Sequence, residues 1–392
     1  MDLAPDFHLF CLALRHPQRA EDAQALRRVV ARGPDWAATV AGARRHRVAP
    51  FLYAALQASG SAEIPEEVIA ELRHHTVATA ARSLAQTAEI CRLFRAFTDA
   101  GVRVLALKGV VLSAQLYGDS ALRNARDIDL LVDPDQFARV DAALVEAGYR
   151  CSNDALSLRQ NASYRHWIKD VEYIHVRDGT AVELHRRLTD NENLLTCDFG
   201  ALWREREDVR LGDATIPTLS RSALALYLCV HGAGHGWERL RWLVDLATLL
   251  REPRSQDAAL AAADAAGLGP VMLHALKLAH DWLGLAVDER HLSRAAADAR
   301  VARLDRFLAP LYAGGAWYEM PPRGSWAGML RYSLWARLYR LSMKSDWVYR
   351  GSQGMREWFT PADWHTVRLP DTLFWLYPVV RPVGWLLRRR QR

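Results

Sequence analysis

Two aspartates stand one residue apart in an apolar segment, Asp127-Ile128-Asp129-Leu130-Leu131-Val132. Because side chains alternate between the two faces of a β-strand, a strand over 127–132 places both carboxylates on one face, with Ile128 and Leu130 on the other. Adjacent carboxylates repel each other unless a cation lies between them. Magnesium commonly bridges one or two carboxylates to substrate phosphates. The spacing therefore indicates a metal-assisted phosphoryl- or nucleotidyl-transfer site.

A third acid follows in the segment Thr180-Ala181-Val182-Glu183-Leu184-His185. On a strand beside 127–132, Glu183 completes a cup of three carboxylates, and His185 lies on the same face. We expect Asp127, Asp129 and Glu183 to bind metal, and His185 to contact a phosphate or assist proton transfer. Two ions are expected, one at the acceptor oxygen and one at the leaving phosphates. The alternative for Glu183 is a surface acid on an edge strand.

The turn before these strands is suited to an anion. Lys108-Gly109 follows an apolar strand predicted over 102–107 and precedes a helix predicted over 109–117. Glycine lets the backbone approach a ligand closely, and a helix N-terminus presents free N–H groups to phosphate. Lys108 adds a positive charge for a triphosphate.

Arg123 lies four residues before Asp127 in a predicted loop. Its guanidinium can hold a phosphate, or it can pair with Asp119 or Asp127, and the sequence favours neither. For Tyr117, packing is favoured over stacking on a base.

Together these residues resemble the bacterial nucleotidyltransferase family of the polymerase-β-like superfamily. That pattern has a glycine, usually with a serine, on the first strand–helix turn, then Asp-hydrophobic-Asp, then a later carboxylate. The resemblance is strong over residues 102–190 and suggestive over 220–250. It implies an α+β fold, with a polymerase-β-like core and a mixed β-sheet embedded between N-terminal and C-terminal helical regions. The segments that carry the resemblance are Lys108-Gly109, Arg123, Asp127–Val132 and Glu183-Leu184-His185.

The resemblance also implies a reaction. A nucleoside monophosphate passes from an NTP, with ATP favoured, to a hydroxyl or phosphate of a small molecule, peptide or protein. Mg²⁺ is the expected cofactor, with Mn²⁺ as a substitute. Val110 stands where many relatives carry serine, so a triphosphate contact is expected from backbone N–H groups, Lys108 or Ser113. The alternative is a catalytically silent nucleotide-sensing or partner-binding protein on the same scaffold, although a silent site has no need of three clustered acids.

Composition divides the 392 residues into three regions. Residues 1–100 are predicted to be helical, 101–215 to form the α/β core, and 216–392 to be mainly helical and rich in tryptophan. Within the core, the remaining predictions are a helix over 134–147 and strands over 171–176 and 180–184.

A second polar cluster lies between Cys229 and Asp245. If this segment is one helix, its spacing places His231, His235, Glu238, Trp242 and Asp245 on one face. Such a helix is expected to face the active-site cleft of the α/β core, with His231, His235, Arg241 or Asp245 contacting nucleotide or acceptor. Structural packing is an equal alternative. A zinc hydrolase site is disfavoured because no HExxH signature is present.

The remaining features concern partners and compartment. A net charge of +6 suits a polyanionic ligand, but no dedicated nucleic-acid motif is present. The cysteines are scattered, which predicts reduced thiols (Cys11, Cys91, Cys151, Cys197, Cys229). The sequence contains no run of about 20 apolar residues, so no membrane span is predicted. Both observations lead us to expect a cytoplasmic protein. Eight of the 14 tryptophans follow residue 315, and the C-terminus is basic. Packing of this tail is favoured over docking on an anionic membrane or partner.

Overall fold

The computed structural model describes residues 5–123, 125–153, 157–196, 198–313, 326–358 and 361–390. The chain folds into two units, and each is assembled from three separate segments. The first unit contains residues 1–91, 107–126 and 205–343. The second contains residues 92–106, 127–204 and 344–392. Both units therefore join segments that are far apart in the sequence, whereas the boundaries predicted at residues 100 and 215 follow composition alone and stay predictions.

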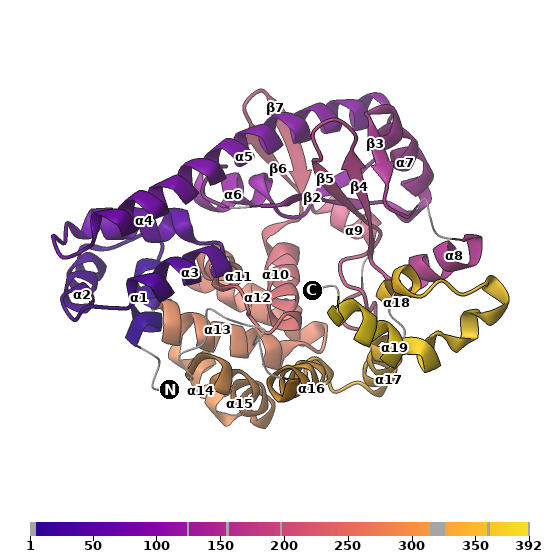
Figure 1. The fold of residues 1–392 in the computed structure, drawn as a ribbon. Helices are drawn as coiled ribbons and strands as arrows, with labels where there is room; N and C mark the ends of the chain where they lie inside the picture. Colours follow the sequence, from indigo (N-terminus) through magenta and orange to yellow (C-terminus); the bar gives the residue numbers. More distant parts are fainter. Residues whose placement is uncertain are drawn as a thin grey trace. The chain divides into compact units, whose positions relative to one another are not determined.

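Five strands of the second unit form a mixed sheet in the order β3-β4-β5-β2-β1 (Figure 1). β2 runs parallel to β5, with Asp129 beside Glu183, and antiparallel to β1 on its other side. β4 is antiparallel to both β5 and β3. The strands are β1 (Val104–Ala106), β2 (Asp127–Val132), β3 (Tyr149–Cys151), β4 (Asp170–His175) and β5 (Ala181–His185).

Burial explains why these segments are strands. Ile128, Leu130, Leu131 and Val132 are all buried, which leaves the aspartates as the polar positions of β2. The strand predicted over 127–132 is confirmed without change, and those predicted over 102–107, 171–176 and 180–184 are confirmed with shifted ends. The helix predicted over 134–147 begins with the short turn η1 (Pro134–Gln136) and continues as α7 (Phe137–Glu146).

The other elements of the second unit follow the sheet in the chain. α17, α18, η3 and α19 belong to its C-terminal segment, where Trp364, Phe374 and Tyr377 form a buried cluster against Tyr164 and Trp167. These elements are α8 (Leu158–Trp167), α9 (Phe199–Arg204), α17 (Trp347–Trp358), α18 (Pro361–Thr366), η3 (Asp371–Leu376) and α19 (Tyr377–Arg390).

The tryptophan-rich tail is only partly packed. Trp364 is buried, but Trp347 and Trp375 are 80% and 64% exposed. Trp317, Cys197 and the last two residues lie outside the described residues, as do the side chains of Trp326, Trp358 and Trp385. Within the part of the chain that the structure describes, no helix has the length and apolar character needed to cross a membrane.

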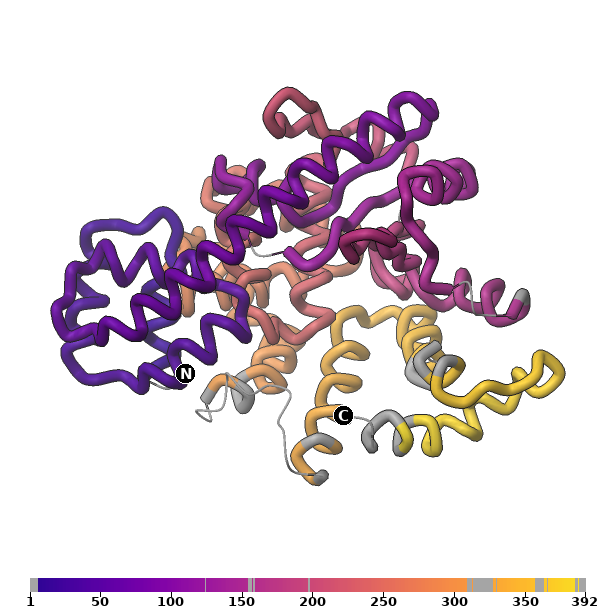
Figure 2. Tube along the Cα trace, turned by 45° about the horizontal axis from the view of Figure 1, so that its top comes forward, coloured from indigo at the N-terminus to yellow at the C-terminus, as the bar shows by residue number. Residues whose placement is uncertain are grey.

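The first unit is mainly helical. α1–α4 form one group, drawn in indigo in Figure 2, and α10–α13 pack against one another. Phe7 of α1 packs edge-on against Trp282 of α13, with 5.3 Å between ring centroids. The helices are α1 (Pro5–Ala13), α2 (Ala20–Val30), α3 (Trp36–His46), α4 (Ala49–Ser59), α5 (Glu66–Asp99, whose end enters the second unit), α6 (Val110–Tyr117), α10 (Arg221–Gly234), α11 (Leu240–Leu249), α12 (Pro253–Ala265), α13 (Gly269–Leu283), α14 (Glu289–Ala297), α15 (Ala299–Ala313) and α16 (Trp326–Ser342).

The first unit also contains an antiparallel hairpin that was not among the strands predicted from the sequence. Its strands are β6 (Glu207–Leu211) and β7 (Ala214–Thr218). Pro217 lies inside β7, and a proline within a run weakens its strand signal.

The polar segment from Cys229 to Asp245 is not one helix, so the single helical face predicted for it is not formed. α10 ends at Gly234 and α11 begins at Leu240. Gly236 and Trp237 between them have φ angles of 60° and 53°, in the left-handed region. The break inserts the fully buried Trp237 beneath α10. Since Trp237 contacts the position of Gly232, tertiary packing accounts for the turn.

Gly232→Ala is expected to destabilise the protein by about 1–3 kcal/mol, the usual cost of overpacking a core. A Cβ at Gly232 would lie 2.2 Å from a ring carbon of Trp237, which cannot move because it is fully buried. Gly234→Ala, at the end of the same helix, is the matched control, because nothing lies within 4 Å of its Cβ position. Urea denaturation followed by tryptophan fluorescence measures both. Equal stability of the two variants would contradict the packing account.

Candidate active site

An acidic cluster lies on one face of the second unit's sheet. The parallel register of β2 and β5 places Asp129 beside Glu183, and His185 follows Glu183 on the same face. His185 Nε2 lies 3.2 Å from Asp129 Oδ1 and 3.5 Å from Glu183 Oε2. Asp170 on β4 faces His185, with its Oδ2 3.8 Å from the same nitrogen. Three neighbouring strands therefore contribute to one polar group of side chains.

The donor set of this cluster fits a divalent cation. One ligand atom from each of Asp129, Glu183 and His185 lies within 4.8 Å of the others. Carboxylate oxygens suit Mg²⁺, and the imidazole nitrogen is also accepted by first-row metals. Asp129 and His185 are buried, whereas the Glu183 side chain is 31% exposed. Asp127 lies on the same strand face and is half-buried. The cluster is thus buried on one side and open on the other.

His185 holds these acids together electrostatically. Complete burial and the charge of Lys169 lower the pKa of His185, but hydrogen bonds to Asp129 and Glu183 and the charge of Asp170 raise it further, so the net pKa lies above the ordinary value. The neighbouring carboxylates therefore favour the protonated form of the ring. Because a metal ligand must be a neutral imidazole, a bound divalent cation would displace this proton.

Lys169 is the second positive charge at the cluster. Its ammonium pairs with Asp170. Burial raises the pKa of Asp170, but the charges of His185 and Lys169 lower it by more, so the net pKa lies below its usual value. Asp170 is therefore an anion, and it was not among the residues that the sequence singled out.

The Lys108-Gly109 turn belongs to the first unit and leads into α6. Gly109 is the residue before this helix and has φ 75° and ψ −141°, a conformation that favours glycine. The N–H groups of Val110, Val111 and Leu112 are the first of α6, which carry no intrahelical bond. Lys108 Nζ lies 5.8 Å from the centre of the Tyr227 ring. The turn thus has the backbone form predicted for an anion-binding helix start.

Ser113, the other hydroxyl predicted for this turn, is fully buried. Its Oγ donates to the carbonyl of Asp119 at 2.5 Å and accepts from the N–H of Arg123 at 3.2 Å. In this conformation the hydroxyl stabilises the loop that follows α6.

Arg123 is buried with a partner that the sequence did not indicate. Its Nε donates to Asp245 Oδ2 at 2.9 Å, and the Tyr117 hydroxyl donates to the other oxygen at 2.8 Å. The side chains of Arg123 and Asp245 are 2% and 0% exposed. This network joins the loop before β2 to α11 within the first unit.

His231 and His235 form an aromatic group with Trp242, with ring centroids 4.9–5.0 Å apart. Glu238 instead accepts hydrogen bonds from Arg45 and Tyr332. Among the described residues, one cluster has the side chains and the spacing to hold a metal ion. This metal-type cluster consists of Asp129, Glu183 and His185 and includes neither His231 nor His235. His235 is exposed and His231 half-buried, whereas Arg241 and Asp245 are buried.

The fold and the site together define a class of protein. A mixed sheet carrying Asp-Ile-Asp on one strand and a glutamate on its parallel neighbour is the arrangement expected of a nucleotidyltransferase. The chain belongs to the family described as uncharacterised nucleotidyltransferase, which matches residues 32–284, more than half of the chain. No curated protein matches it. The protein is therefore a nucleotidyltransferase with an α+β fold, as the sequence motifs predicted.

Proposed function

We propose that this protein transfers a nucleoside monophosphate from an NTP, with ATP the favoured donor, to a hydroxyl or phosphate of an acceptor, and that Asp127, Asp129 and Glu183 bind the Mg²⁺ it requires. The observation that carries the proposal is the convergence of Asp129, Glu183 and His185 donor atoms within 4.8 Å. Bound Mg²⁺ would neutralise the phosphates and favour the deprotonated acceptor oxygen.

The protein's own residues divide the remaining work. His185 positions Asp129 and Glu183 through its hydrogen bonds and can hold a proton at Nε2. We assign the phosphate chain to Lys108 and to the backbone N–H groups that follow Gly109. The Ser113 hydroxyl and the Arg123 Nε, which were predicted for the same role, form hydrogen bonds within the first unit. Of the predicted acceptor contacts, His231 and His235 are the accessible ones. The acceptor is a small molecule, a peptide or a protein.

Thermal unfolding with each NTP, with and without Mg²⁺, tests this function without knowledge of the acceptor. A ligand at about 100 times its Kd stabilises the native state by about 2.7 kcal/mol. We expect a Mg²⁺-dependent rise in melting temperature with one NTP above the others. The rise should vanish in Asp127→Asn/Asp129→Asn, which removes two carboxylate charges and keeps the side-chain size.

The possible results of the thermal-unfolding experiment lead to different conclusions. A shift that needs Mg²⁺ and is lost in the double variant supports the transferase and identifies its donor. A shift without Mg²⁺ that survives in the double variant would favour a silent nucleotide sensor. No shift with any NTP would overturn the proposed donor.

A further inference from the structure

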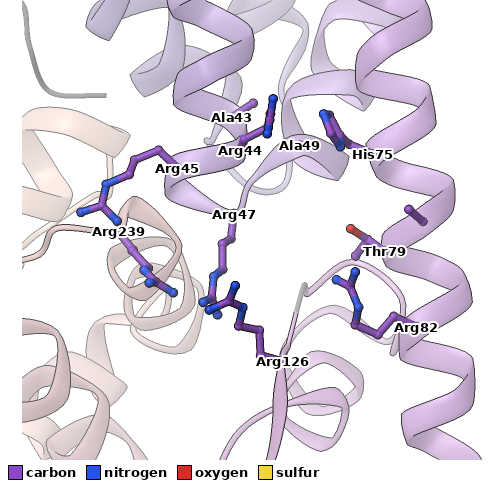
Figure 3. A pocket seen from close by; sticks show the side chains of 11 residues that line it. Ala43, Arg44, Arg45, Arg47, Ala49, His75, Thr79, Arg82, Arg126 and Arg239 are labelled. Atoms are coloured by element: carbon purple, nitrogen blue, oxygen red, sulfur yellow. The ribbon is translucent and has the colours of Figure 1, made fainter. Parts of the chain in front are cut away.

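A pocket lined by arginines lies within the first unit. Its volume is about 590 Å³, within the usual range for small-molecule sites. Arg44 and Arg45 lie on α3, Arg47 follows this helix, Arg82 lies on α5, and Arg239 precedes α11. This arginine pocket is lined by Ala43, Arg44, Arg45, Arg47, Ala49, His75, Ala78, Thr79, Arg82, Arg126 and Arg239 (Figure 3).

The charge of the pocket has one sign. Six of its lining residues are arginines and none is an aspartate or glutamate. Figure 3 shows the guanidinium groups of Arg47, Arg82 and Arg126 directed toward its middle, while Arg45 is directed away. Arg45 pairs with Glu238 at 3.4 Å. Arg47, Arg82 and Arg126 thus place their charges around a space that an anion can enter.

The buried Arg241 experiences the positive charge of two of these arginines, Arg47 and Arg239. Arg241 is 5% exposed, and its Nε and Nη1 make no hydrogen bond within the described part of the chain. Burial lowers the pKa of Arg241 well below its ordinary value, and the charges of Arg123, Arg47 and Arg239 lower it further, against the opposing charge of Asp245. Clustered guanidiniums create a positive potential, so an anion bound among them is attracted by several charges at once.

The geometry selects the type of anion. Guanidinium binds phosphate through two parallel N–H bonds, and one or two arginines suffice for a single phosphate group. Arginines contributed by α3, α5, the residue before α11 and the loop before β2 suit a longer anion with several phosphate groups. Arg126 also directly precedes Asp127, so one peptide bond links the pocket lining to the strand of the proposed metal site.

We propose that the arginine pocket binds an organic anion carrying at least two phosphate groups, and that this binding needs no divalent metal. The ligand is either the phosphate chain of the NTP, in which case the pocket takes the place of the Lys108-Gly109 turn assigned above, or a multiply phosphorylated acceptor. Its role as a substrate rests on the proposed nucleotidyltransferase function, whereas its binding does not.

Calorimetric titration of the whole protein with inorganic tripolyphosphate in EDTA tests the site alone. We expect saturable binding at one site, with orthophosphate at least about tenfold weaker because it reaches fewer guanidiniums. Arg82→Gln and Arg126→Gln should each weaken tripolyphosphate binding about tenfold to a hundredfold, as expected for one lost set of charge-assisted bonds. Arg82→Lys should fall between Arg82→Gln and the wild type.

Two controls separate this site from general charge and from the metal site. Arg28→Gln removes an exposed arginine of α2 that does not line the pocket, and it should leave the affinity unchanged. Asp129→Asn should also bind tripolyphosphate normally, even if it loses metal and NTP. Failure of the proposed transferase function would therefore leave this result intact.

Adding the preferred NTP with Mg²⁺ then distinguishes the two sources of the anion. Displacement of tripolyphosphate assigns the pocket to the donor's phosphate chain, and simultaneous binding assigns it to a phosphorylated acceptor. The proposal is overturned if tripolyphosphate does not bind in EDTA, or if Arg28→Gln weakens binding as much as Arg82→Gln and Arg126→Gln do.

Discussion

Asp129→Asn is expected to weaken Mn²⁺ binding by at least about 100-fold, measured by electron paramagnetic resonance of the free ion in the presence of the stabilising NTP. Mutation of residues that merely support a metal ligand already costs 10–100-fold in affinity, and a ligand itself should cost no less. Asp129 supplies one of the three ligand atoms of the cluster and lies beside both Glu183 and His185, so its replacement removes a ligand.

The matched control for this prediction is Glu172→Gln. Glu172 on β4 stands beside Glu183 in the antiparallel register, on the same face, and it is exposed and outside the metal-type cluster. Removing its charge tests general electrostatics without removing a ligand. Mn²⁺ affinity should change by less than about threefold, in line with a screened surface charge. Comparable losses in Asp129→Asn and Glu172→Gln would mean that the acids attract cations only as a diffuse charge.

Asp245→Asn is expected to destabilise the protein by about 3–5 kcal/mol, because it leaves the charge of Arg123 buried without a counterion. Both side chains are almost completely buried, so water cannot replace the lost carboxylate. Tyr117→Phe should cost about 1–3 kcal/mol, since it removes one hydrogen bond to Asp245 and keeps the ion pair. Urea denaturation measures both variants.

Asp281→Asn supplies the control for this ion pair. Asp281 pairs with Lys277 one helical turn away at 2.7 Å, but the two side chains are 42% and 30% exposed. Such a pair contributes about 0.5 kcal/mol or less. If Asp245→Asn were no more destabilising than Asp281→Asn, the buried network would not be holding the loop before β2 in place.

The ion pair of Asp245 and the acidic cluster of Asp129 are linked through one short segment of the chain. Arg123 and Asp127 are four residues apart, yet Arg123 is held in the first unit and Asp127 begins the sheet of the second. Arg126 lies between them and lines the arginine pocket. The loop from Arg123 to Asp127 therefore connects a stabilising ion pair, a proposed polyphosphate site and a proposed metal site within a few residues.

The sequence alone determined the parts of the site whose periodicity is local. Alternation within Asp127–Val132 specifies both the strand and the face of its acids, because an apolar residue between two carboxylates must turn the other way. The glycine between an apolar run and a helix specifies the Lys108-Gly109 turn, which has the positive φ that glycine permits. The three acids with that turn were also sufficient to predict the nucleotidyltransferase class, which the family match confirms.

Only the tertiary structure decided the contacts between distant segments. Asp245 is the partner of Arg123 across 122 positions, a pairing that no local spacing encodes. The turn at Gly236 and Trp237 overrides a helical pattern because a buried indole fills the space beside Gly232. The run Arg44-Arg45-His46-Arg47 is visible in the sequence, but its meeting with Arg82, Arg126 and Arg239 is not. The periodicity of the sequence indicates on which face of its own helix or strand a residue lies, whereas the packing of the whole chain determines which other element that face contacts.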